Sequence, residues 1–179
     1  MKGPYIIPGR RIDLREVRLS DAGERYLSWL NDAEVSRFLE SRFARHTLED
    51  LKLYIAAAAE SPDSILLAIV LKDDGSHIGN LKIGPINRDH RFASVGLLIG
   101  EKSCWGKGYA TEAISLATRF AFDTLGLHRL EAGAYSLNEA STKAFLKAGW
   151  TREGSERGKW LFDGRYVDGD RISCVRAEH

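Results

Sequence analysis

Few cysteines, almost no net charge and no long apolar run mark this sequence, and each shortage excludes a class of protein. Cys104 and Cys174 are the two cysteines in 179 residues, and their wide separation argues against a metal site and a disulfide framework. The 26 Lys and Arg residues nearly balance the 25 Asp and Glu residues, which leaves a net charge of +1. This balance gives no reason to expect a nucleic acid or an anionic membrane as a partner.

No segment has the pattern of a signal peptide or a membrane span. The first residues, MKGPYIIPGRR, lack an apolar core, and no apolar run approaches the roughly 20 residues of a spanning helix. The length and the hydrophobic content of 44% suit one domain with a sizeable core, and the chain shows no repeat or linker. We therefore expect a cytoplasmic, single-domain protein.

Hydrophobic periodicity predicts an alternation of strands and helices along the chain. Strands are predicted at residues 11–19, 64–72, 78–86, 92–100 and 129–135, and in a closing hairpin of residues 151–162 and 165–176. Helices are predicted at residues 22–32, 48–59 and 109–126, and within residues 136–150.

Turn and cap signals show how these elements connect. Thr47 and Asp50 match a capping box, and Asp74-Gly75 and Asp163-Gly164 are hairpin turn signals. The short turns between the three strands from residue 64 to residue 100 require antiparallel pairing, because a parallel pair needs a longer crossover. One such crossover is predicted around residues 93–134, where a helix connects two parallel strands. The fold is therefore predicted to be α/β, with a mixed, mostly antiparallel sheet of about seven strands and about four helices.

The stretch GEKSCWGKGYATEAI, residues 100–114, places a glycine-rich turn between a strand and a helix. Gly106 and Gly108 permit positive φ angles and close approach of a ligand, and the first N–H groups of the helix are free to bind it. Lys107 adds positive charge, whereas Glu112, which the helix dipole favours, adds negative charge. The turn is a candidate phosphate site, and the alternative is a tight turn that binds nothing.

Two common phosphate-binding motifs fit this turn poorly. A Walker loop requires Ser or Thr where Gly108 stands. Gly106 and Gly108 match two of the three glycines of the Rossmann fingerprint, and Thr111 stands at the third. However, three antiparallel strands precede this motif, whereas the fingerprint opens a parallel sheet. Glu131, about twenty residues further on, lies within a predicted strand and not at its end. An NAD-binding oxidoreductase is kept as an alternative.

The motifs resemble those of the Gcn5-related N-acetyltransferase (GNAT) superfamily. WGKGYA, residues 105–110, is similar to its acetyl-CoA signature Gln/Arg-x-x-Gly-x-Gly/Ala, with Trp105 in the first place as in the RimJ/RimL-like branch. NEASTKAFLKAGW, residues 138–150, and LREVRLSDAGERYLSWLNDAEV, residues 14–35, are similar as well. The resemblance covers residues 10–176 and implies one acetyltransferase domain that uses acetyl-CoA and no metal ion.

The resemblance also implies how acetyl-CoA binds. The strands at 95–99 and 129–134 would splay apart, with the pantetheine arm along the first and the pyrophosphate on the N–H groups of residues 106–111. Asn138 would hydrogen-bond the pantetheine, unless it only caps the next helix, and Lys143 would approach the nucleotide phosphates. The implied cofactor-binding residues are Leu97, Leu98, Ile99, Trp105, Gly106, Lys107, Gly108, Tyr109, Ala110, Thr111, Asn138 and Lys143.

Acetyl transfer needs one proton removed from the amine and one given to the leaving thiolate. Many relatives use a Tyr as the acid where this chain has Phe145, so the implied acid is Ser141, which matches the RimL-like Asn-x-x-Ser element. A family Glu base would fall near Ser94, which leaves His90, Glu101 or a water chain. An α-amine, with a pKa of roughly 7.7–8.0, needs no dedicated base. Ser141 and His90 are the catalytic candidates.

The resemblance also implies that the acceptor binds opposite CoA, between the loop of residues 38–46 and the closing turn of residues 163–168. Arginines in both segments suit an anionic acceptor, and the alternative is a solvated charged rim. The candidate binding residues are Arg42, Phe43 and Tyr166. IGNLKIGPINRDH and WLNDAEVSRFLESRF resemble the amino-sugar N-acetyltransferase subgroup, which implies a nucleotide-linked amino sugar. A ribosomal-protein N-terminus and an aminoacyl small molecule are the other acceptors considered.

Two further functions stand beside the N-acetyltransferase. Phe145 and Ser94 are compatible with a CoA-binding or sensor module that lacks catalysis. The glycine turn is compatible with an NAD-binding oxidoreductase. The sequence does not distinguish a monomer from a homodimer.

Overall fold

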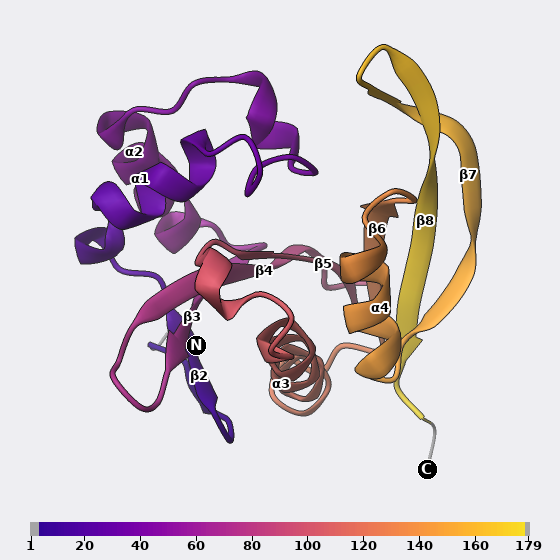
Figure 1. Ribbon diagram of the computed structural model, residues 1–179. Coiled ribbons are helices and arrows are strands. Elements are labelled where there is room, and N and C mark those ends of the chain that lie inside the picture. The colour runs from indigo at the N-terminus through magenta and orange to yellow at the C-terminus, as the bar shows by residue number, and fades with distance from the viewer. Residues whose placement is uncertain (1–3, 178–179) are drawn as a thin grey trace.

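The computed structural model describes residues 4–177 and shows one mixed sheet with helices on both faces (Figure 1). Within this range, eight strands pair in the order β1-β2-β3-β4-β5-β6-β8-β7. Their bounds are β1 Ile6–Pro8, β2 Ile12–Glu16, β3 Ile65–Leu71, β4 His77–Asn87, β5 Phe92–Ile99, β6 Arg129–Tyr135, β7 Thr151–Phe162 and β8 Arg165–Val175. The helices are α1 Glu24–Asn31, α2 Leu48–Glu60, α3 Tyr109–Asp123 and α4 Glu139–Lys147, with 3₁₀ turns η1 Leu19–Asp21, η2 Glu40–Phe43 and η3 Lys102–Cys104.

The α/β class and the mostly antiparallel sheet predicted from the sequence are confirmed. The described residues hold one strand more than predicted, because β1 joins the sheet and pairs Ile6 with Arg15. A strand of 3 residues is too short to show a periodic pattern. Thr47 and Asp50 form the predicted capping box at the start of α2.

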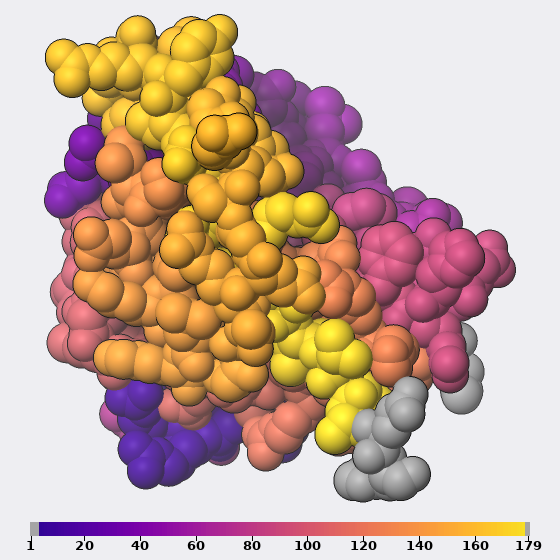
Figure 2. All heavy atoms as spheres, turned by 90° about the vertical axis from the view of Figure 1, so that its right-hand side faces the viewer, coloured from indigo at the N-terminus to yellow at the C-terminus, as the bar shows by residue number. Residues whose placement is uncertain are grey.

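The last two strands form a long hairpin at one end of the sheet. Its turn lies at Asp163-Gly164, as predicted, and the two residues have φ angles of 48° and 76°. Two consecutive positive φ angles are typical of a hairpin turn whose twist matches that of the strands. Figure 2 shows the hairpin covering this side of the molecule, with its turn protruding at the top.

β5 and β6 are the one parallel pair among the described strands, and they separate partway along. They pair over three positions, from Phe92 with Arg129 to Ser94 with Glu131. β5 continues to Ile99 and β6 runs on to its own end, so their facing edges have no partner strand beyond these pairs. The two ribbons diverge visibly in Figure 1. Backbone N–H and C=O groups on these edges are therefore open to a ligand.

Each face of the sheet carries its own buried cluster. α3 packs on one face through Ala113, Ala117 and Ala121, all 0% exposed, which lets the helix lie close to the strands. α1 and α2 cover the other face, where Trp29 and Leu51 belong to a second cluster. Across residues 4–177, every helix is too short or too polar to cross a bilayer.

Candidate active site

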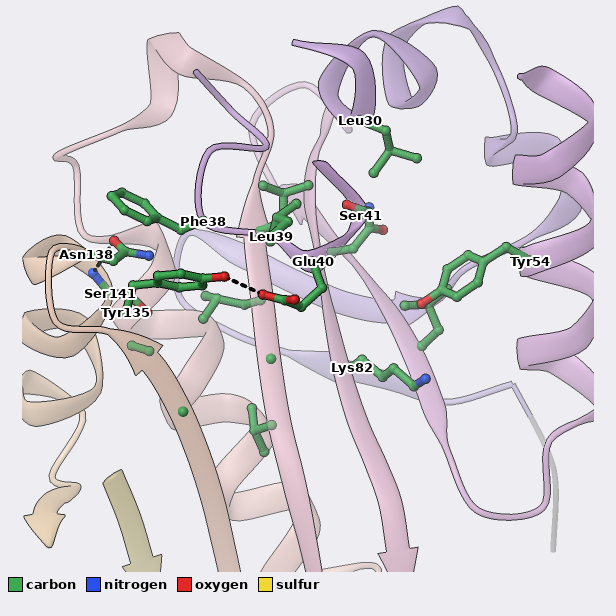
Figure 3. Close-up of a pocket in the computed structure, with 18 of the residues that line it drawn as sticks. Leu30, Phe38, Leu39, Glu40, Ser41, Tyr54, Lys82, Tyr135, Asn138 and Ser141 are labelled. Atoms are coloured by element: carbon green, nitrogen blue, oxygen red, sulfur yellow. Dashed lines mark hydrogen bonds between the residues drawn. The ribbon is translucent and has the colours of Figure 1, made fainter. Parts of the chain in front are cut away.

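A cavity of about 650 Å³ lies beside the divergence of β5 and β6. Side chains from α1, η2, α2, β3, β4, β5, β6, α4 and β7 line it, so both halves of the chain contribute. Figure 3 shows Asn138 and Ser141 next to Tyr135 at one end, and Lys82 and Tyr54 at the other. The cavity therefore reaches from the open strand edges to the face covered by α1 and α2.

The glycine turn lies between η3 and α3, just after β5. Gly106 and Gly108 have φ angles of 71° and 81°, in the left-handed region that favours glycine. Trp105 donates from Nε1 to the carbonyl oxygen of Ile99 at 2.8 Å, which fastens the turn to the end of β5. The N–H of Glu112 donates to Gly108 O at 3.1 Å as the first helical bond. The preceding N–H groups of α3 have no helical acceptor and are left for another partner.

The other residues predicted to hold acetyl-CoA lie on β5, around the glycine turn, and in α4 or at its start. Leu97 and Leu98 of β5 line the cavity, and so does Asn138 at the start of α4. Lys143 is exposed, and its Nζ pairs with Glu139 Oε2 at 2.7 Å on the outer side of α4. Half-buried residues around the turn are Ile99, Tyr109, Ala110 and Thr111.

Glu112 has partners that the sequence did not reveal. Its carboxylate accepts from the backbone N–H groups of Arg10 and Arg11, each at 2.8 Å, and from Arg11 Nε at 2.9 Å. Arg11 also donates from Nη1 to the carbonyl oxygen of Lys107 at 2.8 Å, while the Lys107 side chain is exposed. Partial burial alone would raise the pKa of Glu112, but the hydrogen bonds from Arg11, Ile12 and Arg10 together outweigh it and lower the pKa. The β1–β2 turn is thereby tied to the start of α3.

Of the two catalytic candidates, Ser141 lines the cavity and His90 does not. Ser141 is half-buried in the first turn of α4, where its N–H donates to Asn138 Oδ1 at 3.3 Å. Phe145, one turn later, is 2% exposed and also faces the cavity. His90 is exposed in the turn between β4 and β5, at the opposite end of β5 from the glycine turn. Glu101 is outside the cavity lining as well.

A hydrogen-bonded group near the middle of the cavity was missed by the sequence reasoning. The Tyr135 hydroxyl, at the end of β6, donates to Glu40 Oε1 at 2.6 Å and accepts from Arg42 Nη1 at 2.9 Å. Burial and the bond to Glu40 raise the pKa of Tyr135. Figure 3 shows the bond between Tyr135 and Glu40 crossing the cavity. The network joins η2 to the end of β6, the strand that diverges from β5.

The three residues predicted to bind the acceptor lie outside the cavity lining. Arg42 is bonded to Tyr135, and Phe43 and Tyr166 are 72% and 74% exposed. Lys82 of β4 lines the cavity instead and makes no ion pair within residues 4–177. A cation without a partner at this end of the cavity is available to an acceptor.

Near Lys82, the buried amide of Asn80 lines the cavity and contacts the half-buried His77 behind it. Asn80 is 5% exposed and its Oδ1 lies 2.9 Å from His77 Nε2. An amide oxygen only accepts, so this bond makes Nε2 the protonated nitrogen of His77. Burial lowers the pKa of His77, which keeps the imidazole neutral at pH 7. In residues 4–177, no three His, Cys, Asp or Glu side chains gather as metal ligands would.

The sequence and fold are similar to those of known acetyltransferases. The chain is 30% identical over 173 residues to an uncharacterized N-acetyltransferase (YoaA) of Bacillus subtilis, covering 96% of this chain and 97% of the relative. It is 30% identical over 106 residues to the spermidine N(1)-acetyltransferase of Escherichia coli, covering 59% and 56%. A GNAT-family acetyltransferase from Bacillus anthracis superposes with a TM-score of 0.82 at 19% identity, covering 96% and 98%. Spermidine N-acetyltransferase from Vibrio cholerae, in complex with CoA and spermine, gives 0.81 at 20% identity, covering 92% and 95%.

Residues 11–151 match the family model for the acetyltransferase (GNAT) domain, which is more than half of the chain. A dinucleotide-binding enzyme of the Rossmann type would need a parallel sheet, whereas seven strand pairs here include one parallel pair. The family model matches more than half of the chain, and the Bacillus subtilis relative matches nearly all of it. The chain therefore belongs to the GNAT family as an N-acetyltransferase.

Proposed function

We propose that this N-acetyltransferase moves the acetyl group of acetyl-CoA to a primary amine by direct attack within a ternary complex. The observation that carries the proposal is the divergence of β5 and β6. Residues of both diverging strands line the cavity, and the glycine turn follows the end of β5, so a cofactor at the turn and an amine in the cavity would reach the same strand edge.

Acetyl-CoA fits the unpaired edge of β5 and the turn that follows. The N–H groups of residues 106–111 would bind the pyrophosphate, and the pantetheine would lie along residues 97–99 with Asn138 as a hydrogen-bonding partner. A Cβ on Gly96 would meet no atom within 4 Å, so this part of β5 has room for a ligand. We assign Lys143 to the nucleotide phosphates, because its ion pair with Glu139 is exposed and easily exchanged.

The reaction forms a C–N and an S–H bond and breaks a C–S and an N–H bond. The neutral amine nitrogen attacks the thioester carbonyl carbon, a C–N bond forms, and the C–S bond breaks as the sulfur takes a proton. We propose that the hydroxyl of Ser141 relays this proton from solvent, since Phe145 has none to give. A backbone N–H of β5 would stabilise the oxyanion. The amine proton leaves to water in the cavity, and His90 takes no part because it lies at the far end of β5.

The acceptor is proposed to be a small-molecule amine. The names of two relatives include spermidine, which supports a polyamine. Lys82 supports an amine that also carries an anionic group, such as the nucleotide-linked amino sugar expected for the RimJ/RimL-like branch and its amino-sugar subgroup. A protein N-terminus is a third acceptor. A larger acceptor would extend to Arg42, Phe43 and Tyr166 at the rim.

The catalytic domain is proposed to extend over residues 10–176, beyond the end of the family match. β7 and β8 complete the sheet, and the whole of β6 is paired with β8. Trp160 of β7 lines the cavity and stacks on Tyr135 with ring centroids 5.0 Å apart. A chain that ends at residue 151 would therefore lack one wall of the site.

Release of the CoA thiol from acetyl-CoA tests the proposal directly. Spermidine, a nucleotide-linked amino sugar and a peptide with a free N-terminus serve as acceptors, with buffer alone as the control. We expect amine-dependent thiol release with at least one of them and an acetamide product by mass spectrometry. Binding of CoA without thiol release for any amine would instead favour a module that binds CoA without catalysis.

A further inference from the structure

Glu112 places a negative charge where the proposed function, on which this inference rests, requires an anion to bind. Its carboxylate lies in the first turn of α3, beside the N–H groups assigned to the pyrophosphate. The helix dipole favours either anion there, but two anions repel each other. A residue that removes this conflict should contact both the carboxylate and the turn.

Arg11 makes both contacts. Its Nε donates to Glu112 Oε2 at 2.9 Å, and its Nη1 donates to the carbonyl oxygen of Lys107 at 2.8 Å. Its Nη2 lies toward the glycine turn, since a Cβ built on Gly108 would be 3.4 Å from it. The guanidinium also lies over the ring of Tyr109, 4.8 Å from the centroid. One planar group therefore contacts Lys107 and Tyr109 and lies close to Gly108 between them.

The segment that carries Arg11 is itself fixed against α3. A Cβ on Gly9 would lie 2.4 Å from Ile12 O and 2.7 Å from Leu116 Cδ1, so the chain passes too close for any other residue. The N–H groups of Arg10 and Arg11 donate to Glu112 Oε1, each at 2.8 Å. Arg11 is thus held in place in advance, and little conformational freedom is lost when a ligand binds.

We infer that Arg11 is a positioning residue for acetyl-CoA. Arg11 holds the Lys107 carbonyl oxygen on the side of the turn that faces Arg11, and it neutralises the charge of Glu112. The N–H groups of residues 106–111 are then available to bind the pyrophosphate. Glu112 then assists anion binding through Arg11 in spite of its charge. Trp105 stands where the family signature has Gln or Arg, and Arg11 brings a guanidinium to this turn from a distant segment.

Arg11→Met tests the inference, with Arg15→Met as the matched control. Arg15 makes an equivalent pair with Asp21, at 2.7 and 2.8 Å, without touching the glycine turn. We expect Arg11→Met to raise the Kd for CoA and the KM for acetyl-CoA about tenfold or more, the effect of losing one charge-assisted hydrogen bond. The kcat at saturating acetyl-CoA should stay within about twofold of wild type. Arg11→Lys should recover part of the affinity, and Arg15→Met should lower Tm without changing the Kd for CoA.

Glu112→Gln tests the inference by the direction in which the affinity for CoA changes. Charge repulsion alone predicts tighter CoA binding after the carboxylate is removed, whereas the positioning role predicts weaker binding. Tighter binding in Glu112→Gln, or an unchanged Kd in Arg11→Met, would overturn the inference and leave the proposed function standing. A wild-type protein that binds no CoA would refute the proposed function itself.

Discussion

Replacing Gly108 with valine should weaken CoA binding at least about tenfold, because the turn requires a left-handed residue at this position. Gly108 is the N-cap of α3 with a φ angle of 81°. An L-residue other than glycine loses about 1–2 kcal/mol in this conformation. At about 2–4 °C per kcal/mol for a domain of this size, Tm should fall by roughly 2–8 °C. If valine instead shifts the turn to a negative φ angle, the N–H groups of residues 106–111 no longer converge on one anion.

Gly75→Val is the matched control for this strain. Gly75, in the turn between β3 and β4, has a φ angle of 72°, and a Cβ there would meet no atom within 4 Å. The two variants should therefore lose similar stability. Gly108 lies in the turn assigned to CoA, whereas Gly75 lies outside it. Calorimetric titration with CoA, at a temperature where circular dichroism shows both folded, compares their affinities. We expect Gly108→Val to bind at least about tenfold more weakly than wild type and Gly75→Val to bind as wild type.

Two results would refute this reasoning. Wild-type affinity in Gly108→Val would mean that the turn tolerates a side chain where bare backbone is required. Equal losses of affinity in both variants would mean that CoA binding follows general stability and not the geometry of the turn.

Glu112→Gln should lower Tm by about 2–6 °C at pH 7. The lowered pKa of Glu112 gives stability that is present above the ordinary pKa of 4.5 and is lost as pH falls through the folded-state pKa. In thermal scans, the Tm difference between wild type and Glu112→Gln should therefore narrow below pH 4.5. A Tm difference that stays constant with pH would contradict this. Ser141→Ala should lower kcat about 10²-fold or more with the Kd for CoA unchanged, and an unchanged kcat would remove Ser141 as the proton donor. Gly100→Ala should destabilise the protein by about 1–3 kcal/mol in denaturant titrations. Its Cβ would lie 2.0 Å from Trp29 Cδ2, and wild-type stability would show that this contact relaxes freely.

Signals that act over a few residues predicted most of the fold. The capping box at Thr47, the turn at Asp163-Gly164 and the alternation within the strands each depend on neighbours in sequence, and all are present in the structure. β1 escaped prediction because its 3 residues gain their structure from pairing with β2 and not from a pattern of their own. The order of β6, β8 and β7 in the sheet likewise depends on long-range packing.

The candidate site likewise has parts that the sequence predicts and parts that depend on long-range contacts. The glycine turn was recognisable because its glycines and the start of α3 are adjacent in sequence. Its partner Arg11 is 101 residues from Glu112, and Glu40 is 95 residues from Tyr135, so no local pattern links them. The acceptor role of Arg42 stays a prediction, but its bond to Tyr135 could not be predicted, because that contact depends on where η2 packs.

Thermal unfolding with acetyl-CoA, CoA or NAD, measured in parallel, bears most directly on the role of the glycine turn. A ligand at 100 times its Kd adds about 2.7 kcal/mol to the folded state. For a domain of this size, the addition raises Tm by roughly 5–10 °C. We predict this rise with acetyl-CoA and with CoA, and no rise with NAD. A rise with NAD alone, or no rise with any of the three, would contradict the assignment of the turn to the pyrophosphate of CoA.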